Sequence, residues 1–176
     1  MRKLYLRYGE AAINEDGAFT FSKQGLVESI AHHLWRMPRW GGATTFPWNV
    51  LQHTVFGIRI IENSYSDPIK RQALQVHFAL HDAHEMITGD IPTPIKLLAP
   101  EIVAIQRRID IGIYRALEIA MPTPEQCKEI ENIDATLKDV EEAAMIYQSK
   151  PHKGTWHLEQ QAKAIFMKTL TANIGD

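Results

Sequence analysis

The 176-residue sequence contains a single cysteine, Cys127, so no disulfide can form within the chain. It also lacks a long apolar run, because no window approaches the ~18 uninterrupted apolar residues that a membrane-spanning helix needs. The first ten residues, MRKLYLRYGE, contain no apolar stretch typical of a secretory signal. We therefore expect a cytoplasmic protein that does not associate with membranes.

An excess of positive charge is absent as well. Nineteen lysines and arginines stand against 21 aspartates and glutamates, which gives a formal net charge of -2. Sequence-independent binding to a phosphate backbone requires a strong positive surplus, so a long nucleic acid is not the expected partner. The hydrophobic content of 45% is enough for one core at this length, and we predict a single domain over residues 1–176.

Apolar residues recur at helical spacing over most of the chain, whereas strand signals are nearly absent. The sequence therefore predicts an all-α fold, a compact helical bundle with short connections. Residues 1–21 show no helical period and are expected to form an extended arm or a short hairpin. The expected helices run from Ser22, as N-cap, to near Pro38, and then over residues 50–61, 68–87, 100–120, 124–147 and 157–170.

The densest chemical signal is the segment HDAHE, residues 81–85. Residues four apart share a helix face, so His81 and Glu85 are expected to project together, with Asp82 about a quarter-turn aside. Imidazole and carboxylate suit a divalent transition metal, which lowers the pKa of water and so supplies a nucleophile at neutral pH. Glu85 would then transfer protons. A zincin motif is excluded because no second histidine follows Glu85 at the required spacing.

Two adjacent ligands do not close a metal site, so others must come from different helices. His53 and Asp134 are candidates because each is a polar residue on an otherwise apolar helical segment, where an unpaired carboxylate is costly to bury. Taken alone, His53 is also consistent with a hydrogen-bonded core residue and Asp134 with a solvated one. The metal is left open among Mn, Fe, Co, Ni and Zn.

The order of these residues resembles the H…HD…D pattern of the HD-domain phosphohydrolase superfamily. Within it, the sequence is similar to the branch of small bacterial 5'-deoxynucleotidases and phage dATP triphosphohydrolases. The segments that carry this likeness are IAH (30–32), RWGG (39–42), VLQHT (50–54), ALHDAHE (79–85) and GDIPTPIK (89–96). The resemblance implies an HD-domain bundle with a metal between helices. Its ligands are His53, His81, Asp82 and Asp134, and Glu85 is the catalytic acid or base.

The resemblance also implies four residues that bind substrate. Arg39 contacts phosphate, Trp40 packs against the sugar, Asp90 lies near a sugar hydroxyl, and Lys96 meets phosphate as a point charge. Trp40 lies one residue closer to the first ligand histidine than in the bacterial enzymes. Without the resemblance, Arg39 would be a surface cation, Trp40 a core aromatic, and Asp90 and Lys96 turn and helix-start residues.

Several other polar residues are expected to be structural. Histidines 32, 77 and 84 are interpreted as core, orienting or substrate-facing residues, and Trp156-His157 as a structural anchor. The charged run from Glu125 to Glu142 is interpreted mostly as a solvated helix face.

The two nearest branches release different products, phosphate from a monophosphate or triphosphate from dATP. Lys138 follows Asp134 by one helical turn, so with Arg39 and Lys96 it could supply three cations; it could equally pair with Glu142. We expect triphosphate release from dATP, because the stretch GGATTFPWNVLQH is similar to the phage branch. Alternatives are a 5'-deoxynucleotidase, a hydrolase of cyclic or alarmone nucleotides, and a nucleotide-sensing module without catalysis. The relatives also imply a homo-oligomer, a dimer or a hexamer.

Overall fold

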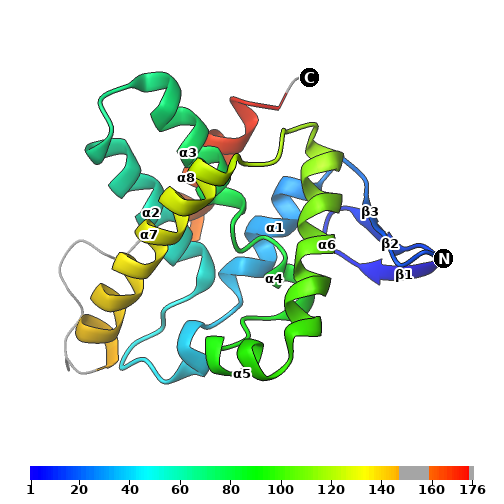
Figure 1. Cartoon of the computed structure of the whole chain (residues 1–176), viewed down its shortest axis with the longest axis horizontal. Helices are drawn as coiled ribbons and strands as arrows, with labels where there is room; N and C mark the ends of the chain where they lie inside the picture. Colours follow the sequence, from blue (N-terminus) through cyan, green and yellow to red (C-terminus); the bar gives the residue numbers. More distant parts are fainter. Residues whose placement is uncertain (147–158, 175–176) are drawn as a thin grey trace.

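The computed structural model describes residues 1–146 and 159–174, which form a helical body with a small sheet at one side (Figure 1). The prediction of a mainly helical fold is confirmed. Trp156-His157 lies outside the described residues. The helices are α1 (Leu26–Trp35), α2 (Val50–Ser64), α3 (Pro68–Leu80), α4 (Glu85–Thr88), α5 (Thr93–Leu98), α6 (Pro100–Leu117), α7 (Pro124–Glu141) and α8 (Glu159–Thr171), with a 3-10 turn η1 (Arg39–Gly42) and a π-helical turn η2 (Glu142–Ile146).

The N-terminal segment is more regular than an arm or a single hairpin. Strands β1 (Arg2–Tyr5), β2 (Glu10–Ile13) and β3 (Phe19–Phe21) form an antiparallel sheet in the order β1-β2-β3, and β3 contacts α6. Ser22 was expected to cap the first helix, which is wrong. Its hydroxyl instead accepts a hydrogen bond from the Glu10 backbone N–H, and α1 starts after Gly25.

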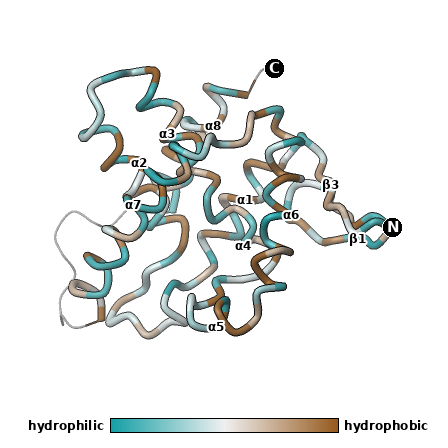
Figure 2. Tube along the Cα trace, in the orientation of Figure 1, coloured by the Kyte–Doolittle hydropathy of each residue, from teal (hydrophilic) through white to brown (hydrophobic). Residues whose placement is uncertain are grey.

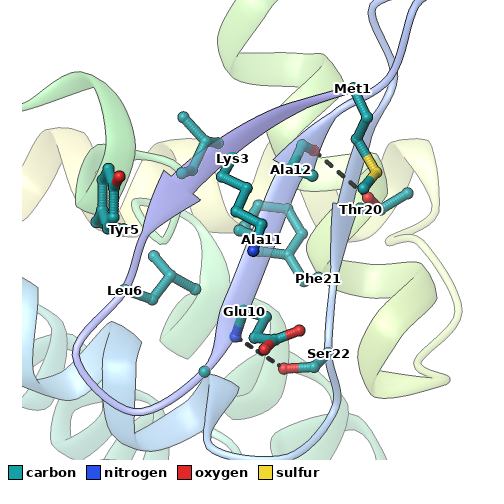
Figure 3. Close-up of a pocket in the computed structure, with 12 residues that line it drawn as sticks. Met1, Lys3, Tyr5, Leu6, Glu10, Ala11, Ala12, Thr20, Phe21 and Ser22 are labelled. Carbon is teal, nitrogen blue, oxygen red and sulfur yellow. Dashed lines mark hydrogen bonds between the residues drawn. The ribbon is translucent and has the colours of Figure 1, made fainter.

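A hollow of about 460 Å³ lies on this sheet, bordered by side chains such as Lys3, Glu10 and Ser22 (Figure 3). None of the predicted site residues lines it. The sheet therefore does not contribute to the site that the sequence predicts.

Helix α2 has a central place in the body, because it contacts α1, α3, α7 and α8. Leu51, Val55 and Ile58 on α2 are buried and belong to the hydrophobic core that all these helices share. Figure 2 shows hydrophobic and hydrophilic positions interchanging along the helices, as expected when one face of each helix is buried. The core fixes α2 and α3 side by side, and the predicted ligands lie on α2 and directly after α3.

Local sequence signals set where these helices begin. Asn49 and Gln52 form a capping box at the start of α2, with Gln52 N–H donating to the Asn49 side chain. Asp67 caps α3, whose first residue is proline. Thr123 and Gln126 form a second capping box, at α7. Each of these three helices therefore has a defined starting point and a defined face toward the core.

The predicted helix over residues 68–87 is interrupted. Helix α3 ends at Leu80, residues 81–84 form turns, and α4 begins at Glu85. The expectation that His81 and Glu85 share a helix face is therefore wrong. A further short helix, α5, follows Pro92 in the stretch that was expected to be a loop. Among the described residues, no helix is long and apolar enough to cross a membrane.

Candidate metal centre and substrate cavity

The four predicted metal ligands come from three parts of the chain and converge. His53 lies on α2, His81 and Asp82 follow α3, and Asp134 lies on α7. The Nε2 atoms of His53 and His81 are 3.4 Å apart. Asp82 Oδ2 is 3.1 Å from His81 Nε2, and Asp134 Oδ1 is 3.2 Å from His53 Nε2. Side chains distant in sequence thus gather four potential ligand atoms around one point.

Both histidines are held so that Nε2 faces this point. His53 Nδ1 is 2.7 Å from Glu141 Oε1, and His81 Nδ1 is 2.6 Å from the Phe78 carbonyl oxygen. An Nδ1–H that donates to an acceptor leaves a lone pair on Nε2, which is how metal-binding imidazoles are oriented. The Phe78 ring packs on His81 at a centroid distance of 4.3 Å.

The close packing of Phe78 depends on a glycine. A Cβ added at Gly57 on α2 would lie 2.0 Å from the Phe78 ring. Only glycine lets this ring reach the histidines, so helix packing and ligand orientation are linked. Gly57 has no chemistry of its own and was not singled out from the sequence.

The residues present fit a divalent cation. With both Nδ1 atoms donating and both rings neutral, two imidazole lone pairs face each other at 3.4 Å, which is unfavourable unless a metal cation or a proton lies between them. Burial opposes ionisation of Asp82, yet His81 and His53 hold its pKa well below the ordinary value. The pKa of Asp134 is lowered for a similar reason, because His53 and His81 together outweigh the effect of burial. Two anionic carboxylates and two imidazoles form a mixed N/O donor set suited to a divalent transition metal.

A cavity of about 210 Å³ borders this cluster. Asp82 and the predicted catalytic residue Glu85 line it. All five predicted substrate residues line it too, namely Arg39, Trp40, Asp90, Lys96 and Lys138. The structure therefore brings the nominated residues together from η1, the turn after α3, α4, the segment that leads into α5, and α7.

Each cation of the cavity lies near an acidic side chain. Arg39 is buried and lies 3.7 Å from Asp82 Oδ2, Lys96 Nζ is 3.9 Å from Glu85 Oε1, and Lys138 donates to Asp134. Of the two acids that spacing offered to Lys138, Asp134 is a partner in the structure. Positive charge is thus present but balanced.

Glu85 differs from its neighbours because it is protonated at neutral pH. Burial, together with the negative charges of Asp82 and Asp90, raises its pKa to about 9. One of its carboxyl oxygens, Oε2, is buried and has no hydrogen-bond partner among the described residues. A buried carboxylic acid with a free oxygen beside a metal cluster is suited to proton transfer.

Glu141 is the main residue that the sequence analysis missed. The run Glu125–Glu142 was expected to be a solvated face, which is wrong at this position because Glu141 has no exposed surface. Burial would raise its pKa, but His53, Arg39 and the Trp48 hydrogen bond lower it to about 2. A signal existed: Glu141 follows Asp134 by seven residues and so lies on the same face of α7.

Two other histidines have structural partners. His84 Nδ1 is 3.0 Å from Asp110 Oδ1 on α6, and His77 stacks on Tyr114 at a centroid distance of 5.9 Å. His84, Asp82 and Glu85 each place a ligand-type atom within 4.8 Å of the others. His77 keeps the core role that the sequence suggested.

The fold and the site together define an HD-domain protein, since a helical body joins a His-Asp pair to a histidine and an aspartate from two other helices. The model of the family "5'-deoxynucleotidase YfbR-like" matches residues 29–146, and the chain belongs to this family. The match includes all the predicted ligands and substrate residues.

Similarity to individual proteins is more distant. The chain is 28% identical to 5'-deoxynucleotidase VV1113 of Vibrio vulnificus over 81 residues, 42% of each chain. It is 27% identical to 5'-deoxynucleotidase PM0747 of Pasteurella multocida over 93 residues, which cover 52% of this chain and 48% of the relative. The chain is also 28% identical over 105 residues to the uncharacterized protein RCAP_rcc00048 of Rhodobacter capsulatus. The chain spans about half the length of the curated relatives it matches.

Proposed function

We propose that this chain is a metal-dependent 5'-deoxynucleotidase that releases phosphate from deoxynucleoside monophosphates. The observation that carries the proposal is the single cavity in which the predicted substrate residues meet Glu85 and the ligand Asp82. When bound at His53, His81, Asp82 and Asp134, a divalent metal would polarise the phosphoryl group and supply a water of lowered pKa.

The chain's own residues perform the remaining steps. Arg39 and Lys96 bind phosphate oxygens and orient the group for in-line attack. Glu85 carries a proton at neutral pH and donates it to the departing 5'-oxygen. Trp40 packs against the deoxyribose, and Asp90 accepts from its 3'-hydroxyl. A sensing module without catalysis is disfavoured because a buried acid with an unpartnered oxygen has no use in it.

Monophosphates are favoured over the dATP that the sequence suggested. The matched family and two of the relatives are named as 5'-deoxynucleotidases. The cavity also offers little surplus positive charge, because Arg39 pairs with Asp82, Lys138 pairs with Asp134, and Asp90 lies close to Lys96. A triphosphate would need further cations or would have to displace these ion pairs. The metal's identity, a homo-oligomeric state and a cytoplasmic location stay predictions.

The test is hydrolysis of dNMPs, NMPs and dNTPs by protein loaded with Mn, Co or Zn, with products resolved by ion-exchange chromatography. We expect phosphate from dNMPs and a kcat/KM for dAMP at least about tenfold above that for AMP. Triphosphate from dATP with dAMP untouched would restore the dATP triphosphohydrolase interpretation. Binding of dNMPs without turnover would make the chain a sensor.

The metal assignment has its own control. His81→Ala and Asp82→Ala should lose both the metal, by elemental analysis, and the activity, because each removes a ligand. Asp139→Asn, an exposed carboxylate on α7, should keep both. Stoichiometric metal in either ligand variant would show that the His-Asp pair does not hold it.

A further inference from the structure

The two carboxylate oxygens of Glu141 serve different parts of the site. Oε1 accepts hydrogen bonds from the ligand His53 Nδ1 at 2.7 Å and from Trp48 Nε1 at 2.9 Å. Oε2 accepts from Arg39 Nε at 2.9 Å and from Trp40 Nε1 at 3.2 Å. One oxygen thus contacts the metal side, and the other contacts the two residues proposed to hold phosphate and sugar.

Trp40 needs such support because its backbone is in an unfavourable conformation. Its φ of 57° and ψ of 28° lie in the left-handed region, which a bulky residue rarely adopts. Such a conformation is strained and persists only where surrounding contacts impose it. The bond to Glu141 is the hydrogen bond that fixes the indole, so the position of the ring over the cavity depends on this carboxylate.

We propose that Glu141 is a positioning residue that couples metal occupancy at His53 to the placement of Arg39 and Trp40. Metal binding then strengthens nucleoside binding, although neither the metal nor Glu141 contacts the nucleoside. A metal on His53 Nε2 fixes the ring and directs Nδ1–H at Oε1. Because a carboxylate is planar and rigid, fixing Oε1 also fixes Oε2 and the two donors bound to it. Coupling between binding sites is reciprocal, so the nucleoside strengthens metal binding equally.

This inference rests on the proposed function for the nature of the ligand, and its test uses binding alone. The probe is 2',5'-dideoxyadenosine, which has no 5'-oxygen and cannot ligate the metal. Its Kd is measured by calorimetry in metal-free protein and at saturating Zn²⁺. In the parent protein we expect Zn²⁺ to tighten binding about fivefold or more, the lower end of typical coupling.

Glu141→Gln breaks the coupling whichever way the amide turns. One side of an amide is an N–H₂ donor, so the two N–H donors facing that side lose their acceptor. We expect the Zn²⁺ effect on the probe to fall below about twofold at saturating metal. Asp139→Asn makes the same chemical change on the exposed face of α7 and should keep the parent ratio. Trp40→Phe keeps a ring in the cavity but removes the Nε1 donor; it should lose the coupling while its Zn²⁺ affinity stays at the parent value.

If Zn²⁺ changes the Kd of the probe as much in Glu141→Gln as in the parent, the coupling is overturned and Glu141 is a purely structural residue. If Glu141→Gln does not fold, the same result in Trp40→Phe overturns the coupling. A parent protein whose Kd for the probe is unchanged by Zn²⁺, or that does not bind the probe, overturns it as well. Failure of the proposed function appears separately, as absence of dNMP hydrolysis by metal-loaded protein whose probe binding still responds to Zn²⁺.

Discussion

Two buried glutamates border the same cluster of predicted metal ligands, and their pKa values are shifted in opposite directions. Glu141 accepts four hydrogen bonds and its pKa is lowered to about 2 despite its burial. Glu85 has Lys96 at 3.9 Å and one oxygen without a partner, and its pKa is raised to about 9.

The difference shows that burial alone does not decide the role of a carboxylate. Hydrogen-bond donors that favour the charged form make Glu141 a permanent anion that orients its neighbours. Their scarcity around Glu85, with Asp82 and Asp90 close by, keeps it neutral and able to give up a proton. The same residue type is a fixed support in one place and a reactive acid in the other.

The largest expected effect concerns the chemistry of Glu85. Glu85→Gln should lower kcat for dAMP by roughly 10²–10⁴-fold, the usual contribution of a positioned acid or base. The metal content should remain at the parent level, because Glu85 is not among the proposed ligands. In the parent, activity should also fall as pH rises through about 9, and the variant should lack this alkaline limb. Loss of metal from Glu85→Gln would show instead that Glu85 is a ligand.

Breaking the Glu141 network should chiefly affect stability. Glu141→Leu leaves the buried Arg39 without the nearer of its two carboxylate partners and three other N–H donors without an acceptor. Removing one partner of a buried ion pair costs roughly 3–5 kcal/mol, and a Tm lower by about 10 °C is expected for a chain of this size. Calorimetry of metal-free protein measures this, with Asp139→Asn as the control. A Tm within two or three degrees of the parent would mean that the network does not stabilise the fold.

Much of the site could be predicted from the sequence because its residues are either contiguous or conspicuous against apolar neighbours. The His81-Asp82 pair is contiguous, and His53 and Asp134 stand out as polar residues on apolar helical segments. The helix break after Leu80 was not predictable from spacing, since the residues on both sides are compatible with a helix. The sheet was also missed, because β3 is only three residues long and its pairing with β2 is a tertiary feature.

Glu141 shows why the rest was missed. From composition, an acid in a charged run is most simply solvated. Its burial depends on donors from η1, from Trp48 and from α2, which are 88 to 102 residues away in sequence. Only the folded chain shows that these N–H groups meet at one carboxylate. Spacing from Asp134 placed it on the correct face but gave no reason to expect partners.

A smaller expected effect is the pH dependence of Tm, which should have opposite signs for the two glutamates. A folded pKa of about 9 against an ordinary 4.5 means that Glu85's contribution is fully present below pH 4.5 and is lost as pH rises through 9. In metal-free protein, the Tm of Glu85→Gln relative to the parent should therefore increase between pH 5 and pH 9, by a few degrees. Glu141 has the opposite sign, since its lowered pKa gives stability above pH 4.5 that is lost toward pH 2. Glu141→Gln should therefore lose most at neutral pH and least at pH 3. A Tm difference for Glu85→Gln that does not change with pH would mean that Glu85 is ionised in the folded protein.

The smallest expected effect tests whether Lys96 limits the difference in pKa between Glu85 and Glu141. The positive charge of Lys96 lowers the pKa of Glu85, opposing the larger effects of burial and of Asp82. Lys96→Met should therefore move the midpoint of the alkaline limb of kcat to higher pH, by less than about one pH unit, because the amine is 3.9 Å away and about a quarter exposed. The variant is also expected to raise KM for dAMP, since Lys96 binds phosphate in the proposed complex, so only the position of the limb tests its influence on Glu85. Lys138→Met is the matched control: it removes a cation from the same cavity, but one bonded to Asp134, and should leave the limb in place. A limb that moves equally in both variants would show that the cavity's total charge, and not the proximity of Lys96, sets the pKa of Glu85.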